Sequence, residues 1–222
     1  MPDENQPQPN QPPAQPNPER KTLDDRAKMN ELERIRHSCA HVMATAVLRL
    51  WPDAQFAAWP PVENGFYYDV DLKHRISPED FPKIEEQMKK EIKANNVFEK
   101  IVVTREHAMK DSESGRLGGL SERPENPSKF KIGNLEAIPE GEPISYFKNG
   151  DFIDLCAGPH AMRTGNIGAF KFTTVAGACY KATIADTKIF LTRKFSLPTC
   201  SSKALMTAIE AGIVAGLECL AQ

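Results

Sequence analysis

The sequence predicts an α+β fold in which helices cover one face of a largely antiparallel sheet. A long amphipathic segment ends near Leu50, a second helix pattern begins at Ser77, and short strand patterns follow one another after Phe98. Helices followed by a run of strands, without the regular alternation of parallel folds, are typical of the α+β class. No internal repeat is visible in the chain.

The composition limits the size, the partners and the compartment of the protein. A chain of 222 residues can form one large domain or two small ones. With 28 basic and 30 acidic residues there is no overall positive field, so any contact with RNA must be local. The five cysteines form no C-x2-C pair, which favours a reducing compartment. No segment has the pattern of a membrane span or a signal peptide, so we expect a cytoplasmic protein without membrane contact.

The first 21 residues are predicted to be a disordered tail. Residues 1–20 contain seven Pro, four Gln and three Asn. Such a segment cannot bury enough apolar surface to offset the entropy lost on ordering. We therefore expect the folded part to begin near Thr22 and to extend to about Tyr180.

An amphipathic helix is predicted from Thr22 to about Leu50. The sequence TLDD from Thr22 resembles a capping box, and Pro52 ends the helix. Apolar residues recur at spacings of three and four, namely Leu32, Ile35, Cys39, Val42, Met43, Ala46 and Leu50. His37 and His41 point away from this stripe, beside small and apolar neighbours. This environment indicates the wall of a cleft more than a solvated face.

Short stretches rich in aromatic and β-branched residues are predicted to be strands. They cover residues 66–72, 98–104, 130–132, 144–147, 152–155 and 170–175. A second helix begins with Ser77 as its N-cap and Pro78 at its first position. Residues 105–110 form a short helical turn. Residues 111–128, rich in Ser, Gly, Pro and charge, are predicted to be a loop.

Four of the ten Cys and His residues fall into two short pairs. His37 and His41 are four residues apart on the predicted helix and share one of its faces. Cys156 and His160 are also four residues apart, across a Gly-Pro bend. Either pair alone is more often an ordinary structural feature than a site. Together, three imidazoles and a thiol could surround a metal ion or a reactive water.

Four motifs in this order, from about Glu31 to Tyr180, resemble a known family. They are HSCAH (37–41), NGFYYDVDL (64–72), DLCAGPH (154–160) and FKFTTVAGA (170–178). The combination is similar to the second N-terminal domain of bacterial threonyl-tRNA synthetases, which is related to a domain of alanyl-tRNA synthetases and their free-standing editing homologues. The resemblance implies a class II synthetase editing-domain fold. It also implies hydrolysis of seryl-tRNA that has been mischarged onto threonine tRNA, which is double-sieve editing.

The same resemblance implies which residues do the chemistry. The family's editing positions correspond to His37, His41, Lys131, Asp154, Cys156 and His160. It implies that a water attacks the ester carbonyl, and that a histidine or the lysine activates this water or protonates the leaving ribose oxygen. No cofactor is required in this scheme. Zinc held by His37, His41, Cys156 and His160 is left open, by analogy with the alanyl relatives.

The sequence departs from the family pattern in two places. Trp59-Pro60 stands where the family has Gly-Pro, and a tryptophan prevents the close backbone approach that a glycine allows. After Tyr180 the pattern is lost, so we expect residues 181–222 to be a divergent, loosely packed tail, with a helix pattern over 203–220. Because the family pattern is lost there, we expect this protein to lack the family's aminoacylation core and anticodon-binding domain.

Three functions therefore remain as hypotheses. The first is an editing enzyme that takes mischarged seryl-tRNA as its substrate. The second is an inactive truncated or frameshifted synthetase fragment, or a tRNA-binding module without turnover. The third is a small structural domain stabilised by zinc. The sequence does not indicate the oligomeric state.

Overall fold

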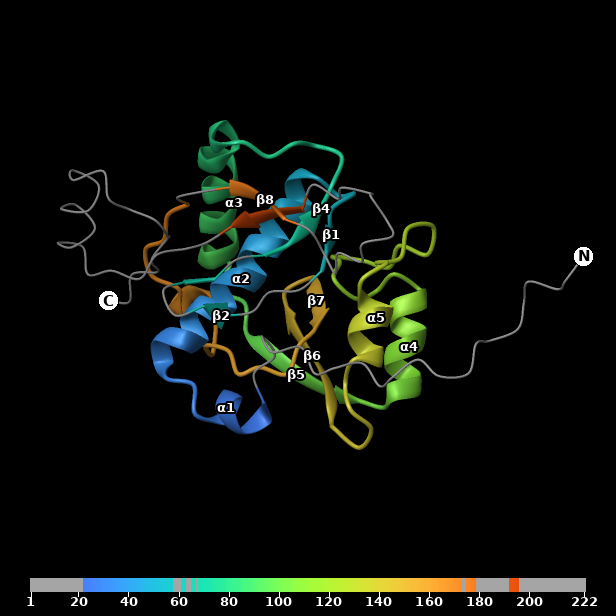
Figure 1. Ribbon diagram of the computed structural model, residues 1–222. Helices are drawn as coiled ribbons and strands as arrows, with labels where there is room; N and C mark the ends of the chain where they lie inside the picture. The colour runs from blue at the N-terminus through green and yellow to red at the C-terminus, as the bar shows by residue number, and fades with distance from the viewer. Residues whose placement is uncertain are drawn as a thin grey trace, which may run out of the picture.

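The computed structural model describes residues 22–57, 61–62, 65–66, 68–172, 175–178 and 192–195. In this part of the chain, helices pack against antiparallel sheets, which confirms the predicted α+β class (Figure 1). One sheet has the strand order β1-β4-β9-β8, a second has the order β5-β6-β7, and β2 pairs with β3. The predicted N-terminal tail, Trp59 and the helix pattern over 203–220 lie outside the described residues.

The N-terminal helical region consists of two helices, so the prediction of one continuous helix was wrong. α1 (Leu23–Ala27) begins at the predicted capping box, with Thr22 as its N-cap. α2 (Glu31–Leu50) begins at a second capping box. Asn30 Oδ1 accepts from the Glu33 amide at 3.0 Å, and Glu33 Oε2 accepts from the Asn30 amide at 2.8 Å. This second cap starts a new helix, which the apolar spacing alone did not reveal.

The helix α2 is the central element of the fold. Every residue from Ile35 to Leu48 is buried, and α2 packs against α3 (Phe81–Lys93) and against core residues of both larger sheets (Figure 1). The predicted apolar stripe, apart from Leu32, belongs to this core or packs against it. The opposite side of the helix, which carries His37 and His41, is covered as well. The two histidines therefore lie in the interior of the protein and not on a solvated face.

The four-stranded sheet and the β2–β3 hairpin contain short strands. Their bounds are β1 Gln55–Phe56, β2 Pro61–Val62, β3 Gly65–Phe66, β4 Val70–Asp71, β8 Val175–Ala178 and β9 Thr192–Phe195. The predicted strand 66–72 is thus divided between β3 and β4. Residues 170–172 are not in a strand, and β8 begins at the end of the strand predicted there. β9, from the segment expected to be a divergent tail, pairs with both β4 and β8.

The last strand of the three-stranded sheet leads into the loop that carries Cys156 and His160. It consists of β5 (Phe98–Val103), β6 (Ile144–Asn149) and β7 (Phe152–Leu155), close to the predicted ranges. Phe147 and Phe152 face the core around α2, whereas Tyr146 and Ile153 face a second core cluster on the other side. Because side chains alternate along a strand, the two faces of this sheet bury different clusters.

The second core cluster is covered by α4 (Arg105–Glu113) and α5 (Lys131–Glu136), so helices lie on both faces of the three-stranded sheet (Figure 1). The prediction of a strand at 130–132 was wrong, because this segment begins α5. A three-residue apolar pattern fits a strand and a buried helical turn equally well. The Asn134 amide donates to the Phe130 carbonyl at 3.0 Å, which closes the first turn.

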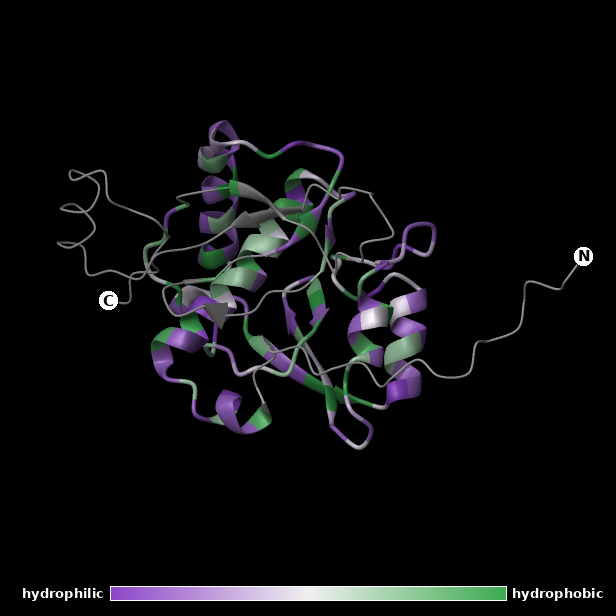
Figure 2. Ribbon diagram, viewed as in Figure 1, coloured by the Kyte–Doolittle hydropathy of each residue, from purple (hydrophilic) through white to green (hydrophobic). Residues whose placement is uncertain are grey.

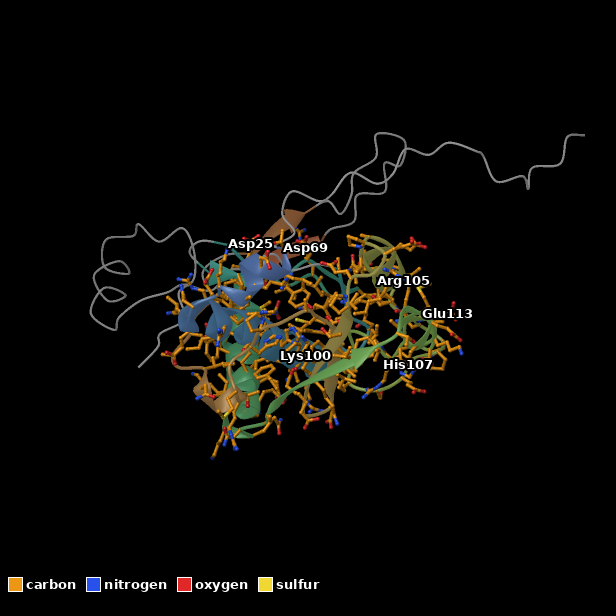
Figure 3. All side chains as sticks on the ribbon, turned by 90° about the horizontal axis from the view of Figure 1, so that it is seen from below. Asp25, Asp69, Lys100, Arg105, His107 and Glu113 are labelled. Carbon is orange, nitrogen blue, oxygen red and sulfur yellow. The ribbon has the colours of Figure 1, made fainter. Side chains whose placement is uncertain are left out.

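The surface elements follow the predicted patterns. Ser77 opens a short 3-10 turn, Pro78–Asp80, which leads directly into α3. Figure 2 shows α3 as mostly hydrophilic with apolar residues between, and Phe81, Ile84 and Met88 on this helix are buried. Lys100 on β5 and His107 and Glu113 on α4 are exposed, and Figure 3 shows His107 and Glu113 near one edge of the molecule. None of the described helices has the length and apolar character needed to cross a membrane.

Candidate functional site

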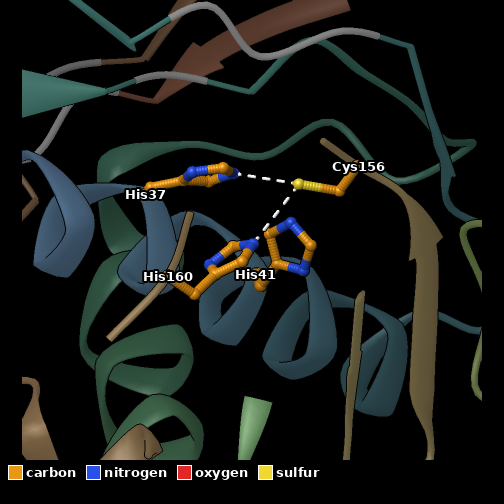
Figure 4. Close-up of side chains that lie close together, drawn as sticks. All are labelled: His37, His41, Cys156 and His160. Atoms are coloured by element: carbon orange, nitrogen blue, oxygen red, sulfur yellow. Dashed lines mark hydrogen bonds between the residues drawn. The ribbon is translucent and has the colours of Figure 1, made fainter. Parts of the chain in front are cut away.

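The two predicted pairs meet in the interior of the protein (Figure 4). His37 and His41 project from the middle of α2, and Cys156 and His160 come from the loop after β7. The potential ligand atoms of these four residues all lie within 4.8 Å of one another. Cys156 Sγ lies 3.2 Å from His37 Nε2 and 3.3 Å from His160 Nε2. We refer to these four residues as the histidine–cysteine cluster.

The loop after β7 is held in place by backbone contacts and by one glycine. Gly158 has φ +74°, and a Cβ there would lie 2.6 Å from a ring carbon of Phe147, so the chain packs too closely for another residue. The Gly158 amide donates to Cys156 Sγ at 3.2 Å. Ser145 Oγ donates to the Cys156 carbonyl at 2.8 Å, and Arg26 Nη1 of α1 donates to the Gly158 carbonyl at 3.0 Å.

Aromatic rings position His160 within the cluster. Its ring is stacked on Phe98, with centroids 4.7 Å apart and planes 3° apart, and it contacts Phe147 at 4.4 Å. Its centroid lies 3.8 Å from that of His37 and 4.3 Å from that of His41. His160 is half-buried, whereas the other three members are buried. It is therefore the member of the cluster that solvent reaches most easily.

Burial keeps His41, Cys156 and His160 neutral in the absence of a metal. Desolvation lowers the pKa of His41 to about 4; Asp154 opposes this shift and Lys131 adds to it. Desolvation also lowers the pKa of His160 well below its usual value, helped by the neighbouring imidazoles. Burial raises the pKa of the Cys156 thiol to about 12. At neutral pH these imidazoles carry no charge and offer lone pairs.

A buried ion pair lies beside the cluster. Lys131 Nζ contacts Asp154 Oδ1 at 2.8 Å and Oδ2 at 2.9 Å, and their side chains are 2% and 0% exposed. The Leu155 amide donates to Asp154 Oδ1 at 2.8 Å. Because Asp154 is two residues from Cys156, both side chains leave the extended chain on the same side. The charges of Asp154 and Lys131 act on both His41 and Cys156, so the ion pair lies close to the cluster.

Two further residues of the site were not predicted from the sequence. The hydroxyl of Tyr68 is fully buried and donates to Asp154 Oδ2 at 2.9 Å. Burial and the nearby Asp154 raise the pKa of Tyr68, so it remains a donor. The aromatic run around Tyr68 was interpreted only as a strand, although a buried tyrosine needs a partner for its hydroxyl. The second residue is Ser38, which contacts His160 and lies between the two histidines in sequence.

The donor set of the cluster fits a metal ion. Three imidazole nitrogens and one sulfur form a ligand set suited to zinc, whose tetrahedral geometry separates neighbouring ligand atoms by about 3.3–3.6 Å. The two Cys156 distances, 3.2 and 3.3 Å, are close to this range. Binding would require Cys156 to lose its proton, which a metal promotes. The donor set and these two distances therefore suit a metal ion, while the four ligand atoms as a group lie within 4.8 Å of one another.

The comparisons with known proteins concern the segment that carries part of this cluster. Residues 145–188, which include Asp154, Cys156 and His160, match the family described as "Threonyl and Alanyl tRNA synthetase second additional domain". The chain therefore contains a domain of this synthetase family, as its motifs predicted.

Its relatives in this family include threonine–tRNA ligases. The chain is 46% identical over 146 residues to the threonine–tRNA ligase of Acetivibrio thermocellus, and 44% identical over 147 residues to that of Fusobacterium nucleatum. It is 39% identical over 150 residues to threonine–tRNA ligase 1 of Bacillus subtilis. These alignments cover 66%, 66% and 68% of this chain, and 21%, 22% and 22% of the relatives. The chain thus spans about a fifth of the length of these relatives.

The neutral state of His41 predicts a loss of stability in acid. In the unfolded chain His41 takes up a proton near its ordinary pKa of 6.5, whereas in the folded protein its pKa is about 4. Between these values the unfolded state binds more protons, so stability is complete above the upper value and falls as the pH is lowered toward the lower one. For the metal-free protein this lowering of the His41 pKa corresponds to a decrease of about 3 kcal/mol in the free energy of unfolding as the pH falls.

Urea unfolding at a series of pH values measures this loss. A His41→Gln variant should show a shallower decline between pH 6.5 and about 4 than the unchanged protein. The matched control is His107→Gln on the exposed side of α4, which should retain the full decline. Equal declines in the unchanged protein and the His41 variant would contradict the prediction.

Proposed function

We propose that this chain hydrolyses the ester bond of mischarged seryl-tRNA(Thr) and releases serine and intact tRNA. The observation that carries the proposal is the buried histidine–cysteine cluster next to the Lys131–Asp154 pair, within a domain of the synthetase family. Neutral imidazoles and a buried ammonium group supply the two requirements of ester hydrolysis. These are a proton acceptor for the attacking water and a positive charge near the developing oxyanion.

In the proposed reaction a water molecule enters from the side of His160, the half-buried member of the cluster. An imidazole lone pair accepts a proton from this water as its oxygen attacks the ester carbonyl. The ammonium of Lys131 stabilises the negative charge that forms on the carbonyl oxygen. The bond to the ribose oxygen then breaks, and this oxygen receives the proton taken from the water. The products are free serine and a tRNA with its terminal hydroxyl restored.

Asp154 and Tyr68 hold Lys131 in place for this role. The carboxylate contacts the ammonium through both oxygens, and the tyrosine hydroxyl satisfies one of these oxygens as well. A buried ammonium without such partners would lose its proton or disrupt the fold. The pair therefore supports a fixed positive charge in a place that water does not screen.

The test is deacylation by the unchanged chain. We expect it to release serine from seryl-tRNA(Thr) and to leave threonyl-tRNA(Thr) largely intact, because an editing site must spare the correct product. Release of radiolabelled amino acid measures both rates, and a filter-binding assay with the same tRNA measures affinity. Binding without release would favour a tRNA-binding module. Neither binding nor release would favour an inactive fragment.

A second candidate role, zinc binding, is supported by the four-ligand donor set. Bound zinc would be held by His37, His41, Cys156 and His160 and would link α2 to the loop after β7. Sites with four protein ligands are typical of structural zinc, since catalytic sites keep a position open for water. Metal analysis of the purified chain, with thermal unfolding before and after chelation, tests this role. If deacylation persists in metal-free protein, the hydrolysis does not depend on zinc.

A further inference from the structure

We propose that Ser38 is a positioning residue that sets the tautomer of His160. Its hydroxyl holds His160 with the ring hydrogen on Nδ1, so that the lone pair of Nε2 points toward Cys156. The expected effect of Ser38 on the rate of hydrolysis rests on the proposed function, but the assignment of the His160 tautomer does not. Ser38 is fully buried on α2, on the helix turn that carries His37 and His41.

The hydrogen bonds of Ser38 favour a donor role for His160 Nδ1. A serine hydroxyl has one hydrogen to donate and two lone pairs to accept with. Ser38 Oγ lies 2.8 Å from the Arg34 carbonyl, which can only accept, so the hydroxyl hydrogen points there. The Ala161 amide donates to the same oxygen at 2.8 Å. The remaining lone pair faces His160 Nδ1 at 3.2 Å, the longest of the three contacts, and we therefore assign the ring hydrogen to Nδ1.

This assignment fixes the opposite nitrogen of the ring. A neutral imidazole with its hydrogen on Nδ1 has a lone pair on Nε2, and His160 Nε2 lies 3.3 Å from Cys156 Sγ. The other tautomer would place an N–H against the thiol and a lone pair against the serine lone pair.

The same tautomer serves both roles proposed for the cluster. A proton acceptor for water and a metal ligand each need a free lone pair on the nitrogen that faces the cluster centre. Outer partners of this kind orient histidines, and their loss commonly lowers activity by about 10–100-fold. The stacking of His160 on Phe98 fixes the plane of the ring, while Ser38 selects which nitrogen carries the hydrogen.

The tautomer can be read directly in the unchanged, metal-free chain by nitrogen NMR with labelled histidine at neutral pH. We expect His160 to show a protonated Nδ1 and an unprotonated Nε2, with its signals assigned by their absence in a His160→Gln sample. A hydrogen on Nε2 would overturn the proposal. Because this measurement needs neither a Ser38 variant nor tRNA, it decides the tautomer even if the variant fails to fold or the chain does not hydrolyse seryl-tRNA.

Two matched hydroxyl deletions then test the cause. Thr45 lies two turns further along α2, is also buried, and donates to the His41 carbonyl at 2.8 Å as Ser38 does to Arg34. Ser38→Ala should convert His160 to a mixture of tautomers and lower the kcat of deacylation by about 10–100-fold with little change in KM. Thr45→Val should leave the tautomer unchanged. A Ser38→Ala spectrum identical to that of the unchanged chain would overturn the proposal.

Discussion

Replacing Asp154 by asparagine is expected to lower the free energy of unfolding by about 3–5 kcal/mol. The substitution preserves the shape of the side chain but removes the negative charge that Lys131 contacts at 2.8 Å. Both residues are buried, so the ammonium would remain in the interior without a counter-charge. The cost is large because desolvation of a single charge is no longer offset by its partner. Urea unfolding of the purified variant measures the loss.

Two further variants separate the charge effect from ordinary packing. Adding Lys131→Met to Asp154→Asn removes both charges and should restore a large part of the lost stability. The pair Lys110–Glu106 on the outside of α4, at 2.9 Å, is the exposed counterpart, and Glu106→Gln should change stability by less than about 0.5 kcal/mol. If the double variant is no more stable than Asp154→Asn alone, the uncompensated charge is not the cause.

Replacing His41 by alanine is expected to lower the rate of seryl-tRNA hydrolysis by about 10²-fold or more, the usual scale for a positioned acid–base group. His41 is fully buried, and its ring lies 5.5 Å from that of His37 and 4.3 Å from that of His160. Its loss removes a lone pair from the centre of the cluster. Cys156→Ala is expected to have an effect of similar size. Single-turnover release of serine measures both rates.

The control for this experiment is another histidine in the same chain. His107 lies on the exposed side of α4 and contacts Asp111 at 3.2 Å, outside the histidine–cysteine cluster. His107→Ala should hydrolyse seryl-tRNA at the rate of the unchanged chain. Circular dichroism must show that His41→Ala remains folded. A folded His41→Ala protein with full activity would remove His41 from the proposed mechanism.

The fold was predictable wherever local chemistry decides the structure. The cap at Ser77 and the strand pattern at 152–155 are confirmed, because capping and alternation depend on neighbouring residues in sequence. The prediction of a strand at 130–132 was wrong, because a pattern of three residues does not distinguish a strand from the first turn of α5. The cap at Asn30 was overlooked, and it divides the N-terminal helical region in two.

The sequence by itself determined which residues belong to the candidate site. The spacing of four in each His and Cys pair, together with the family motifs, selected the histidine–cysteine cluster, Lys131 and Asp154. Only the tertiary structure decided what surrounds them. Burial of α2 between Ile35 and Leu48 makes the His41 imidazole neutral, and the approach of the loop after β7 places Ser38 against His160. Tyr68 joins Asp154 from a distant segment. Desolvation and hydrogen bonding between distant segments arise only when the chain is packed, so no pattern of neighbouring residues records them.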